Sequence, residues 1–288
     1  MFKKAEKKKS KLRLALTGPS GSGKTFSALK IATGIANKID SRIAFIDTEK
    51  GSASLYADRF DFDVIELDAP YKIDDYIKSI KSAEENGYKV LIIDSTTHGW
   101  HFILDFVDKV STTKYKGNSL RAWQEGTPLY NKWINSMLDF KGHIIVTMRA
   151  KTEYVISYDE NTRKQKVEKV GMGSENRKGI EYEFTSVGEG DTNHNFLFSK
   201  DRTGLLQDKI ITPDENLGTE LIEWLEQGID LEAKEKEDLE VALIELEKVE
   251  SKEQLIDLLI IYDNLKKNKE FLEAIKPYKE KFKERKGA

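Results

Sequence analysis

The sequence predicts an α/β fold with a mainly parallel central sheet, followed by a small helical appendage. Short β-rich runs alternate with longer amphipathic stretches as far as Arg149, an alternation that is typical of parallel α/β folds. Several of the β-rich runs are continuously apolar, as strands buried on both faces are. From about residue 230 onward the chain is rich in charge and carries leucines at helical spacing, which predicts short helices.

The expected elements follow one another in a regular order. Strands are expected at residues 12–18, 42–48, 63–67, 89–95 and 143–149. Helices are expected at residues 24–37, near Ala53, at residues 73–86 and in the stretch that leads to Phe140. Beyond Arg149, polar-rich alternating segments at residues 152–158, 164–170, 180–187 and 194–200 predict antiparallel hairpins that close the sheet at its C-terminal edge. A last helix of this part is expected at residues 216–226, with Gly228 as its C-cap.

Composition limits the class of protein. A chain of 288 residues suits one full α/β domain with an appended piece, because single cores usually stop growing at roughly 250 to 300 residues. With 39% hydrophobic residues, 34% charged residues and a formal net charge of −3, the chain has the composition of a soluble globular protein. It has no cysteine, which excludes disulfides, thiol catalysis and cysteine-based zinc sites and fits a reducing compartment. We therefore expect a cytoplasmic protein with no membrane segment.

Three parts are expected along the chain: a basic N-terminal arm at residues 1–10, an α/β core at residues 11–228 and a helical appendage at residues 229–288. The N-terminal cations are Lys3, Lys4, Lys7, Lys8, Lys9, Lys11 and Arg13. Such an arm can contact nucleic acid, but it can equally be a solvated, frayed end. The short apolar run that follows leads straight into a glycine-rich segment, so the N-terminus does not resemble a cleaved leader.

The glycine-rich segment matches the phosphate-loop pattern G-x-x-x-x-G-K-[ST]. It lies between a predicted strand and a predicted helix, which is the context that this motif requires. Its glycines let backbone N–H groups face phosphate oxygens, Lys24 would neutralise the β- and γ-phosphates, and the Thr25 hydroxyl would hold Mg²⁺. The alternative is a merely glycine-rich turn. The predicted ATP-binding residues of the loop are Gly18, Pro19, Ser20, Gly21, Ser22, Gly23, Lys24 and Thr25.

Two strand-ending carboxylates are candidates for the remaining chemistry. Asp94 closes the apolar run VLIID, the form of a Walker B element, and would steady the Mg²⁺ shell together with Thr25. Glu49 follows the strand ending FIDTE, where a carboxylate could orient the attacking water. The order of a phosphate loop, FIDTE and IIDS resembles the RecA-type recombinase core, and this resemblance implies that Glu49 is the general base. The alternative is that Glu49 is a solvated loop residue beside Asp47.

Later segments narrow the resemblance. HIIVTMRAKTEYV, GIEYEF and SKDRTGL are similar, in order and spacing, to the phage-encoded RecA-like ATPases of the Sak type, which act in annealing and recombination. The similarity spans residues 11–228. It implies that Thr147 and Arg149 sense the γ-phosphate, and that Lys200 and Arg202, in a K-x-R-x-G motif like that of the RadA branch, reach a neighbouring subunit's nucleotide. Thr203 stands where RadA-type sequences carry an aromatic residue, and a solvated turn is the alternative for the two cations.

The resemblance also points to single-stranded DNA as a partner. One candidate segment is the loop after Asp94, and the other is the loop after Arg149; phosphate contacts and base stacking on aromatic rings both suit single strands. Trp123 and Trp133 could instead belong to the core. The candidate residues are Lys114, Tyr115, Lys116, Arg121 and Trp123 in the first segment and Arg163, Lys164, Lys166, Lys169, Arg177 and Lys178 in the second.

We therefore expect a Mg²⁺-dependent ATPase that works as a homo-oligomer with nucleotide at its subunit interfaces, in a phage-type recombination pathway in the bacterial host cytoplasm. The C-terminal helices could recruit a single-strand-binding protein or another recombination or replication protein. The histidines show no metal-ligand spacing and are assigned no metal. A nucleotide-gated binding module or loader is the alternative, and a small-molecule kinase ranks lower because no acceptor-site pattern follows the loop.

Overall fold

The structure is a computed structural model that describes residues 4–158 and 165–284. The chain separates into two compact units. One unit comprises Lys11–Leu225, and the other joins the N-terminal segment before Lys11 to the chain from Glu226 onward. None of the helices in the described residues combines the length and the apolar character needed to cross a membrane.

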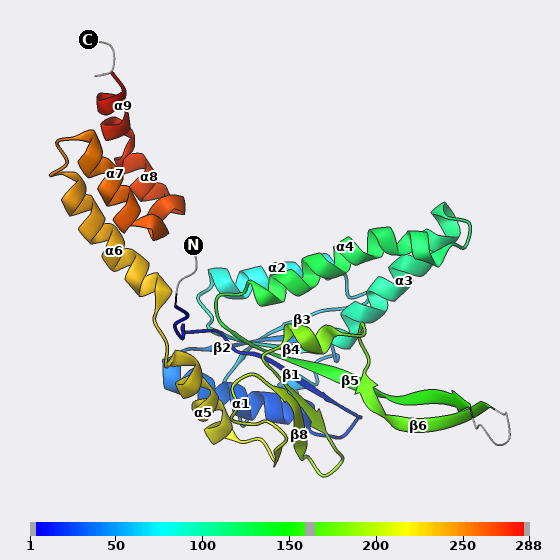
Figure 1. Ribbon diagram of the computed structural model, residues 1–288. Coiled ribbons are helices and arrows are strands. Elements are labelled where there is room, and N and C mark those ends of the chain that lie inside the picture. The colour runs from blue at the N-terminus through cyan, green and yellow to red at the C-terminus, as the bar shows by residue number, and fades with distance from the viewer. Residues whose placement is uncertain (1–3, 159–164, 285–288) are drawn as a thin grey trace. The chain divides into compact units, whose positions relative to one another are not determined.

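A central sheet forms the middle layer of the larger unit (Figure 1). Its strand order is β3-β2-β4-β5-β1-β7-β8-β9, parallel from β3 to β7 and antiparallel at the β8–β9 edge, so the predicted fold class is confirmed. Because β5 lies between β1 and β4, the segments that follow these three strands emerge side by side at one edge of the sheet. The strands are β1 Arg13–Gly18, β2 Ile43–Asp47, β3 Asp63–Glu66, β4 Val90–Asp94, β5 His143–Tyr158, β7 Ser186–Gly190, β8 Phe196–Asp201 and β9 Ile210–Ile211.

Helices cover both faces of the sheet. Alternate residues of the inner strands enter opposite cores: Ile92 packs with α1 and α5, whereas Leu91 and Ile93 pack with α2, α3 and α4. Burial on both faces therefore explains the continuously apolar runs. The helical elements of this unit are α1 Lys24–Ile39, the 3-10 turn η1 Ala53–Tyr56, α2 Ile73–Glu85, α3 Thr96–Lys114, α4 Ser119–Leu138, the 3-10 turn η2 Ile180–Glu183 and α5 Glu215–Glu226.

The chain after Arg149 departs from the prediction in one respect. β5 continues beyond the sheet and pairs antiparallel with β6 (Gln165–Ser174), so this hairpin is a projecting ribbon and does not close the sheet (Figure 1). The segment IEYE is η2, and the strand after it joins β1 in parallel. The antiparallel edge of the sheet is formed by the β7–β8 hairpin, which the sequence predicted, and by β9, which it did not.

The segment after Asp94 also differs from the expectation. The expected loop directly after Asp94 is a helix instead, because α3 begins at Thr96, only two residues beyond the strand. Contact of this segment with DNA stays a prediction. Lys114 ends that helix, and the turn to α4 carries Lys116 and Gly117, both with left-handed backbone angles of 52° and 87°. The candidate cations therefore lie at the far end of a helical hairpin.

Arg13, counted above among the N-terminal cations, belongs to the core. Its guanidinium donates hydrogen bonds of 2.7 Å to the carbonyl oxygens of Gly142 and Leu138 and of 2.5 Å to that of Phe140, and so fastens β1 to the connection between α4 and β5. Burial lowers the pKa of Arg13 to about 10, against the opposing charge of Asp139. Arg13 is thus a structural residue and not part of a basic arm.

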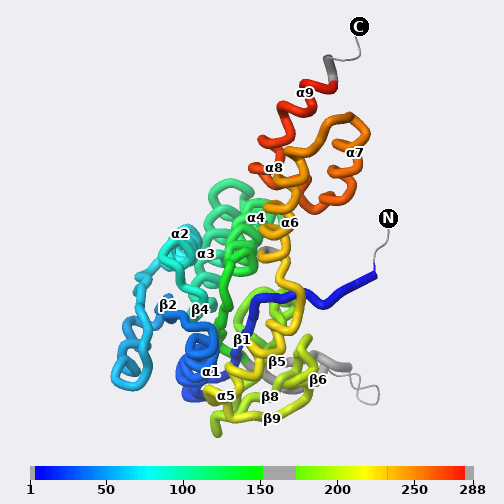
Figure 2. Tube along the Cα trace, turned by 90° about the vertical axis from the view of Figure 1, so that its left-hand side faces the viewer, coloured from blue at the N-terminus to red at the C-terminus, as the bar shows by residue number. Residues whose placement is uncertain are grey.

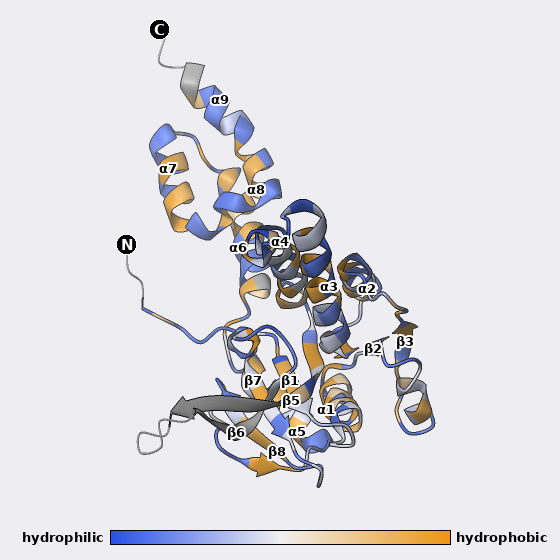
Figure 3. Ribbon diagram, turned by 90° about the vertical axis from the view of Figure 1, so that its right-hand side faces the viewer, coloured by the Kyte–Doolittle hydropathy of each residue, from blue (hydrophilic) through white to orange (hydrophobic). Residues whose placement is uncertain are grey.

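The smaller unit has its own hydrophobic core. Buried residues from five elements, among them Leu246, Leu258, Leu265 and Phe271, form that core, and the apolar stretches of α7 and α8 are visible in Figure 3. Ser251 and Gln254 form a reciprocal capping box at the start of α7. The elements are α6 Leu231–Leu246, α7 Lys252–Ile261, the 3-10 turn η3 Asp263–Lys267, α8 Lys269–Ala274 and α9 Lys276–Glu284.

The N-terminal segment lies beside the start of this unit (Figure 2). The N–H of Lys9 donates to the carbonyl of Ile229 at 3.0 Å, and the N–H of Ile229 donates to the carbonyl of Lys7 at 2.9 Å. A Cβ on Gly228 would come within 2.3 Å of the Lys8 carbonyl carbon. Gly228 therefore permits a close approach of two backbones, and its φ is not in the left-handed region that a C-cap glycine uses.

Candidate nucleotide site

The predicted phosphate loop connects β1 to α1 at the carboxyl edge of the sheet. Gly21 and Gly23 have left-handed φ angles of 79° and 80°, which glycine adopts without steric cost. A Cβ on Gly18 would come within 2.5 Å of the Ser22 hydroxyl oxygen. The loop borders a pocket of about 930 Å³, whose lining includes Ser20, Gly21, Gly23, Lys24, Thr25, Phe26, Ser27, Lys30, Glu49, Ser52, Tyr56, Arg59, Asp94, Arg149, Glu175, His194, Thr212 and Pro213.

Lys24 closes the loop on itself. Its ammonium group donates to the carbonyl oxygens of Gly18 and Pro19 at 3.0 and 2.8 Å, and the Ser22 hydroxyl donates to the carbonyl of Pro19 at 2.9 Å. Burial lowers the pKa of Lys24, while the nearby carboxylates of Asp94 and Glu49 oppose that shift. The loop thus holds a partly desolvated cation beside backbone N–H groups, which is the donor set that a chain of phosphates requires.

Asp94 joins residues from three elements. The Thr25 hydroxyl donates to Asp94 Oδ2 at 2.5 Å, and the Thr147 hydroxyl donates to Asp94 Oδ1. Burial raises the pKa of Asp94, although both hydroxyls oppose that shift by bonding to the charged form. One hydroxyl and one carboxylate fit Mg²⁺, which usually takes few protein ligands and completes its shell with water and phosphate oxygens.

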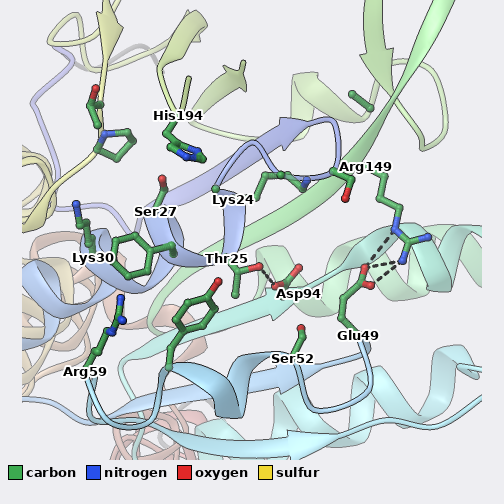
Figure 4. A pocket seen from close by; sticks show the side chains of 18 of the residues that line it. Lys24, Thr25, Ser27, Lys30, Glu49, Ser52, Arg59, Asp94, Arg149 and His194 are labelled. Carbon is green, nitrogen blue, oxygen red and sulfur yellow. Dashed lines mark hydrogen bonds and ion pairs between the residues drawn. The ribbon is translucent and has the colours of Figure 1, made fainter. Parts of the chain in front are cut away.

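Glu49 and Arg149 form an ion pair on the neighbouring side of the pocket (Figure 4). Arg149 Nη2 lies 2.6 and 2.9 Å from the two carboxylate oxygens of Glu49, and Nε lies 3.2 Å from Oε1. Ser95 donates a longer hydrogen bond of 3.3 Å to Oε1. Burial would raise the pKa of Glu49, but the hydrogen bonds and charge of Arg149 outweigh it and hold that pKa below its ordinary value. Glu49 is therefore a half-buried, ionised carboxylate that lines the pocket.

Asp47 has a structural role that differs from the role of Glu49 in the pocket. It is 1% exposed, and its two oxygens accept the N–H groups of Glu49 and Ala53 at 2.5 and 3.0 Å. These bonds fix the turn after β2, and Asp47 does not line the pocket described above. Asp47 is thus the residue that positions the loop carrying Glu49.

Several residues of the pocket have no counterpart in the sequence prediction. Lys30 and Arg59 border the end of the pocket away from Glu49 (Figure 4). Tyr56 and Phe26 also line the pocket, and their rings lie 5.6 Å apart. His194 reaches the phosphate loop from the turn between β7 and β8. Long sequence separation from the phosphate loop hid His194. The others lie close in sequence to the phosphate loop or to Glu49 but belong to no motif. Only the aromatic rings near the phosphate loop and near Glu49 gave a signal, since aromatic side chains commonly line ligand pockets.

Lys200 and Arg202 are not among the residues that line this pocket. Lys200 donates to the carbonyls of Glu181 and Tyr182 at 2.7 and 2.9 Å, and Arg202 donates to that of Tyr182 at 3.0 Å. Both cations therefore satisfy the carbonyls of η2 in their own chain. Their action on a neighbour's nucleotide stays a prediction.

The candidate DNA-contacting residues are scattered over several elements. Lys114 binds Glu125 at 2.5 Å, Trp133 is fully buried, and Arg177 lies over the rings of Trp123 and Tyr130 at 5.4 and 4.9 Å. Exposed cations among the candidates are Lys114, which is paired with Glu125, and Lys116, Arg121 and Lys178. Arg163 and Lys164 lie outside the described residues, and the side chains of Lys166 and Lys169 lie in a part of β6 that is described by its backbone alone.

Comparison with known proteins gives one family and one weak structural match. A KaiC-like protein of the hyperthermophilic archaeon Pyrococcus horikoshii OT3 matches with 17% identity over 69% of this chain and 82% of its own, with a TM-score of 0.38, which supports no inference about function. The comparison with curated proteins gave no match. The profile of the AAA_24 family, described as an AAA domain, matches residues 10–248. Since that match covers most of the chain, the protein belongs to this AAA domain family of P-loop ATPases.

Proposed function

We propose that the protein hydrolyses ATP with Mg²⁺ at the phosphate loop, and that Glu49 activates the attacking water. The observation that carries the proposal is the convergence of Lys24, Thr25, Asp94 and Glu49 on one pocket from three different strand ends. The pocket combines backbone donors, a cation, a hydroxyl–carboxylate pair and a second carboxylate. This is the set of groups that phosphoryl transfer to water uses.

Each residue has a separate task in this proposal. Lys24 would exchange its two carbonyl partners for the β- and γ-phosphate oxygens, and Thr25 and Asp94 would hold Mg²⁺, which when bound neutralises phosphate charge. Glu49 would accept the proton of the water that attacks the γ-phosphorus, while the bond from that phosphorus to the oxygen bridging it to the β-phosphate breaks. For Glu49 to accept this proton, its ion pair with Arg149 has to break. Arg149 can then bind the γ-phosphate, an anion that takes the place of the Glu49 carboxylate.

The test is the Lys24→Ala variant. Hydrolysis should fall below detection and ATP affinity should weaken, whereas the fold should persist, because the ammonium group contacts only loop carbonyls. Lys109→Ala removes an exposed lysine of α3 and is the matched control. Turnover of the Lys24 variant at the wild-type rate would overturn the proposal.

We further propose that the ATPase acts on single-stranded DNA in a phage-type recombination pathway, as an oligomer. The resemblance to Sak-type proteins motivates this proposal, and two features support it. The strand that carries Thr147 and Arg149 continues as the projecting ribbon, so the pocket and the ribbon share one strand. Lys116 and Arg121 are exposed at the tip of the α3–α4 hairpin, free to meet phosphates. A single-strand-binding protein or another replication protein is the proposed partner of the C-terminal helices.

Single-strand affinity measured against salt tests the DNA proposal. The log–log slope should be about −0.7 per phosphate contacted. Replacing Lys116 and Arg121 by alanine should make the slope shallower, whereas replacing the exposed Lys78 and Lys81 of α2 should not. Absence of binding at low salt with ATP present would overturn the DNA proposal. ATP turnover that is slow and insensitive to DNA would then favour the nucleotide-gated binding module.

A further inference from the structure

The turn between β7 and β8 carries His194 to the phosphate loop. A Cβ built on Gly23 would lie 2.9 Å from His194 Nδ1 and 3.4 Å from Cγ, so the imidazole rests on the space that this glycine leaves open. Two features therefore require glycine at position 23: the left-handed φ of 80°, and the space that the imidazole ring occupies where a Cβ would lie. Figure 4 shows His194 beside the phosphate loop, on the same side as Lys24 and Ser27.

The turn holds His194 in a fixed position. Asp191 accepts the N–H groups of Asn193 and Asn195 at 2.8 and 3.0 Å through one carboxylate oxygen, and its own N–H donates to the carbonyl of Asn195 at 2.9 Å. His194 has a left-handed φ of 66°. The Asn195 side chain accepts a hydrogen bond of 2.7 Å from Thr212, which itself lines the pocket. The turn is thus closed by its own hydrogen bonds and is tied to the pocket wall through Asn195.

The imidazole is open to a ligand. His194 is exposed and lines the pocket, and within the described part of the chain no side chain forms a hydrogen bond with its ring. An imidazole can donate a hydrogen bond to a phosphate oxygen, and bonds to a charged acceptor are the stronger ones. The hydrogen-bonded turn therefore holds an imidazole N–H, without a side-chain partner among the described residues, beside a loop that binds phosphate.

We infer that His194 is a nucleotide-binding residue that donates a hydrogen bond to the β-phosphate. The loop backbone cradles the α- and β-phosphates, while the lysine of the motif reaches the β- and γ-phosphates. His194 lies against Gly23, the residue next to Lys24, and the phosphate that these two parts of the cradle share is the β-phosphate. This inference rests on the proposed ATP site. It adds to that site a nucleotide-contacting residue that lies about 170 positions after the phosphate loop in the sequence.

Binding of AMP, ADP and ATP, measured by calorimetry in the presence of Mg²⁺, tests the assignment. His194→Phe keeps a ring against Gly23 but has no donor, and should weaken ADP and ATP about tenfold and AMP less than twofold. His194→Gln retains a donor and should recover part of the loss. Asn193→Ala, in the same turn, leaves the backbone bond to Asp191 in place and should bind as the wild type does.

The outcomes separate the inference from the proposed function. If His194→Phe binds ADP and ATP as the wild type does, the ring only packs and the inference is overturned. Loss confined to ATP would move the contact to the γ-phosphate, and equal loss for all three nucleotides would mark a structural defect; either result contradicts the assignment. A wild-type protein that binds none of the three would overturn the proposed ATP site, and the inference with it.

Discussion

Arg149 and Glu49 are 100 positions apart in the chain and form a bidentate ion pair across the end of β4. Glu49 follows β2 and Arg149 lies on β5, and β4, which ends in Asp94, separates these two strands in the sheet. The pair therefore joins the segment after β2 to the middle of β5, two strands that are not neighbours in the sheet, next to the strand whose carboxylate contacts Thr25. Its position links the candidate base to the strand that continues as the projecting ribbon.

Glu49→Gln should separate binding from turnover. The amide keeps the shape of the side chain but cannot take the proton of water, so we expect turnover to fall by about 100-fold or more with ATP affinity within a few-fold of the wild type. Glu85→Gln, an exposed position on α2, is the control. Parallel loss of binding and turnover would identify Glu49 as a structural residue.

Arg149→Ala should change the pH dependence of turnover. Arg149 holds the pKa of Glu49 down in the protein without nucleotide, so its removal raises that pKa and moves the acidic limb of the kcat/KM profile, which reports the free enzyme, to higher pH. Turnover at neutral pH should also fall, because the predicted contact to the γ-phosphate is lost. Arg149→Lys keeps the charge without the bidentate geometry, so its turnover and its acidic limb should lie between those of the wild type and those of Arg149→Ala. An unmoved acidic limb would show that Glu49 is not the titrating base.

The role of Arg202 can be tested by mixing two variants. If Arg202 acts on a neighbour's nucleotide, Arg202→Ala should bind ATP but hydrolyse little, and addition of Lys24→Ala protein should restore activity by donating an intact Arg202. Such fingers contribute about 10³ to 10⁵ in rate. Its bond to the Tyr182 carbonyl predicts only a small loss of stability, which thermal unfolding measures. Co-assembly without restored activity would reduce Lys200 and Arg202 to their structural contacts with η2.

His143 should make stability depend on pH. Its Nδ1 accepts the N–H of Leu12 at 3.1 Å, and burial, with the charges of Lys11 and Arg13, lowers the pKa of His143 to about 3. Below the ordinary pKa of 6.5 the unfolded chain takes up a proton that the folded chain refuses, so stability is lost as pH falls from 6.5 towards 3. Between about pH 7.5 and pH 5 this group should cost about 2 kcal/mol.

The His143→Asn variant isolates that contribution. Its side-chain oxygen can accept the Leu12 N–H but does not titrate, so its free energy of unfolding should depend less steeply on pH. Urea unfolding of both proteins at pH 7.5 and pH 5 gives the change in the free energy of unfolding for each. The difference between these two changes isolates His143, because the other titrating groups are the same in both proteins. Equal pH dependence of the two proteins would contradict the buried, neutral state of His143.

The local chemistry of the site could be predicted from the sequence. The phosphate loop, Asp94 and Glu49 each lie within one short segment whose residue types dictate its conformation: glycines permit the left-handed turn, and an apolar run ending in a carboxylate carries that group to the edge of a buried sheet. The parallel strands were predictable for the same reason, because burial on both faces requires an unbroken apolar run. In each case the decisive interactions are local or are required of every residue in the element.

Tertiary structure alone decided which of these groups meet. The register of β5 between β1 and β4 brings Thr147 to Asp94 and Arg149 to Glu49, and the β7–β8 turn brings His194 to Gly23. It also buries Arg13 and His143, which residue type alone would place at the surface. These outcomes depend on strand order and register, which are set by the packing of the whole core and have no signature in any single segment.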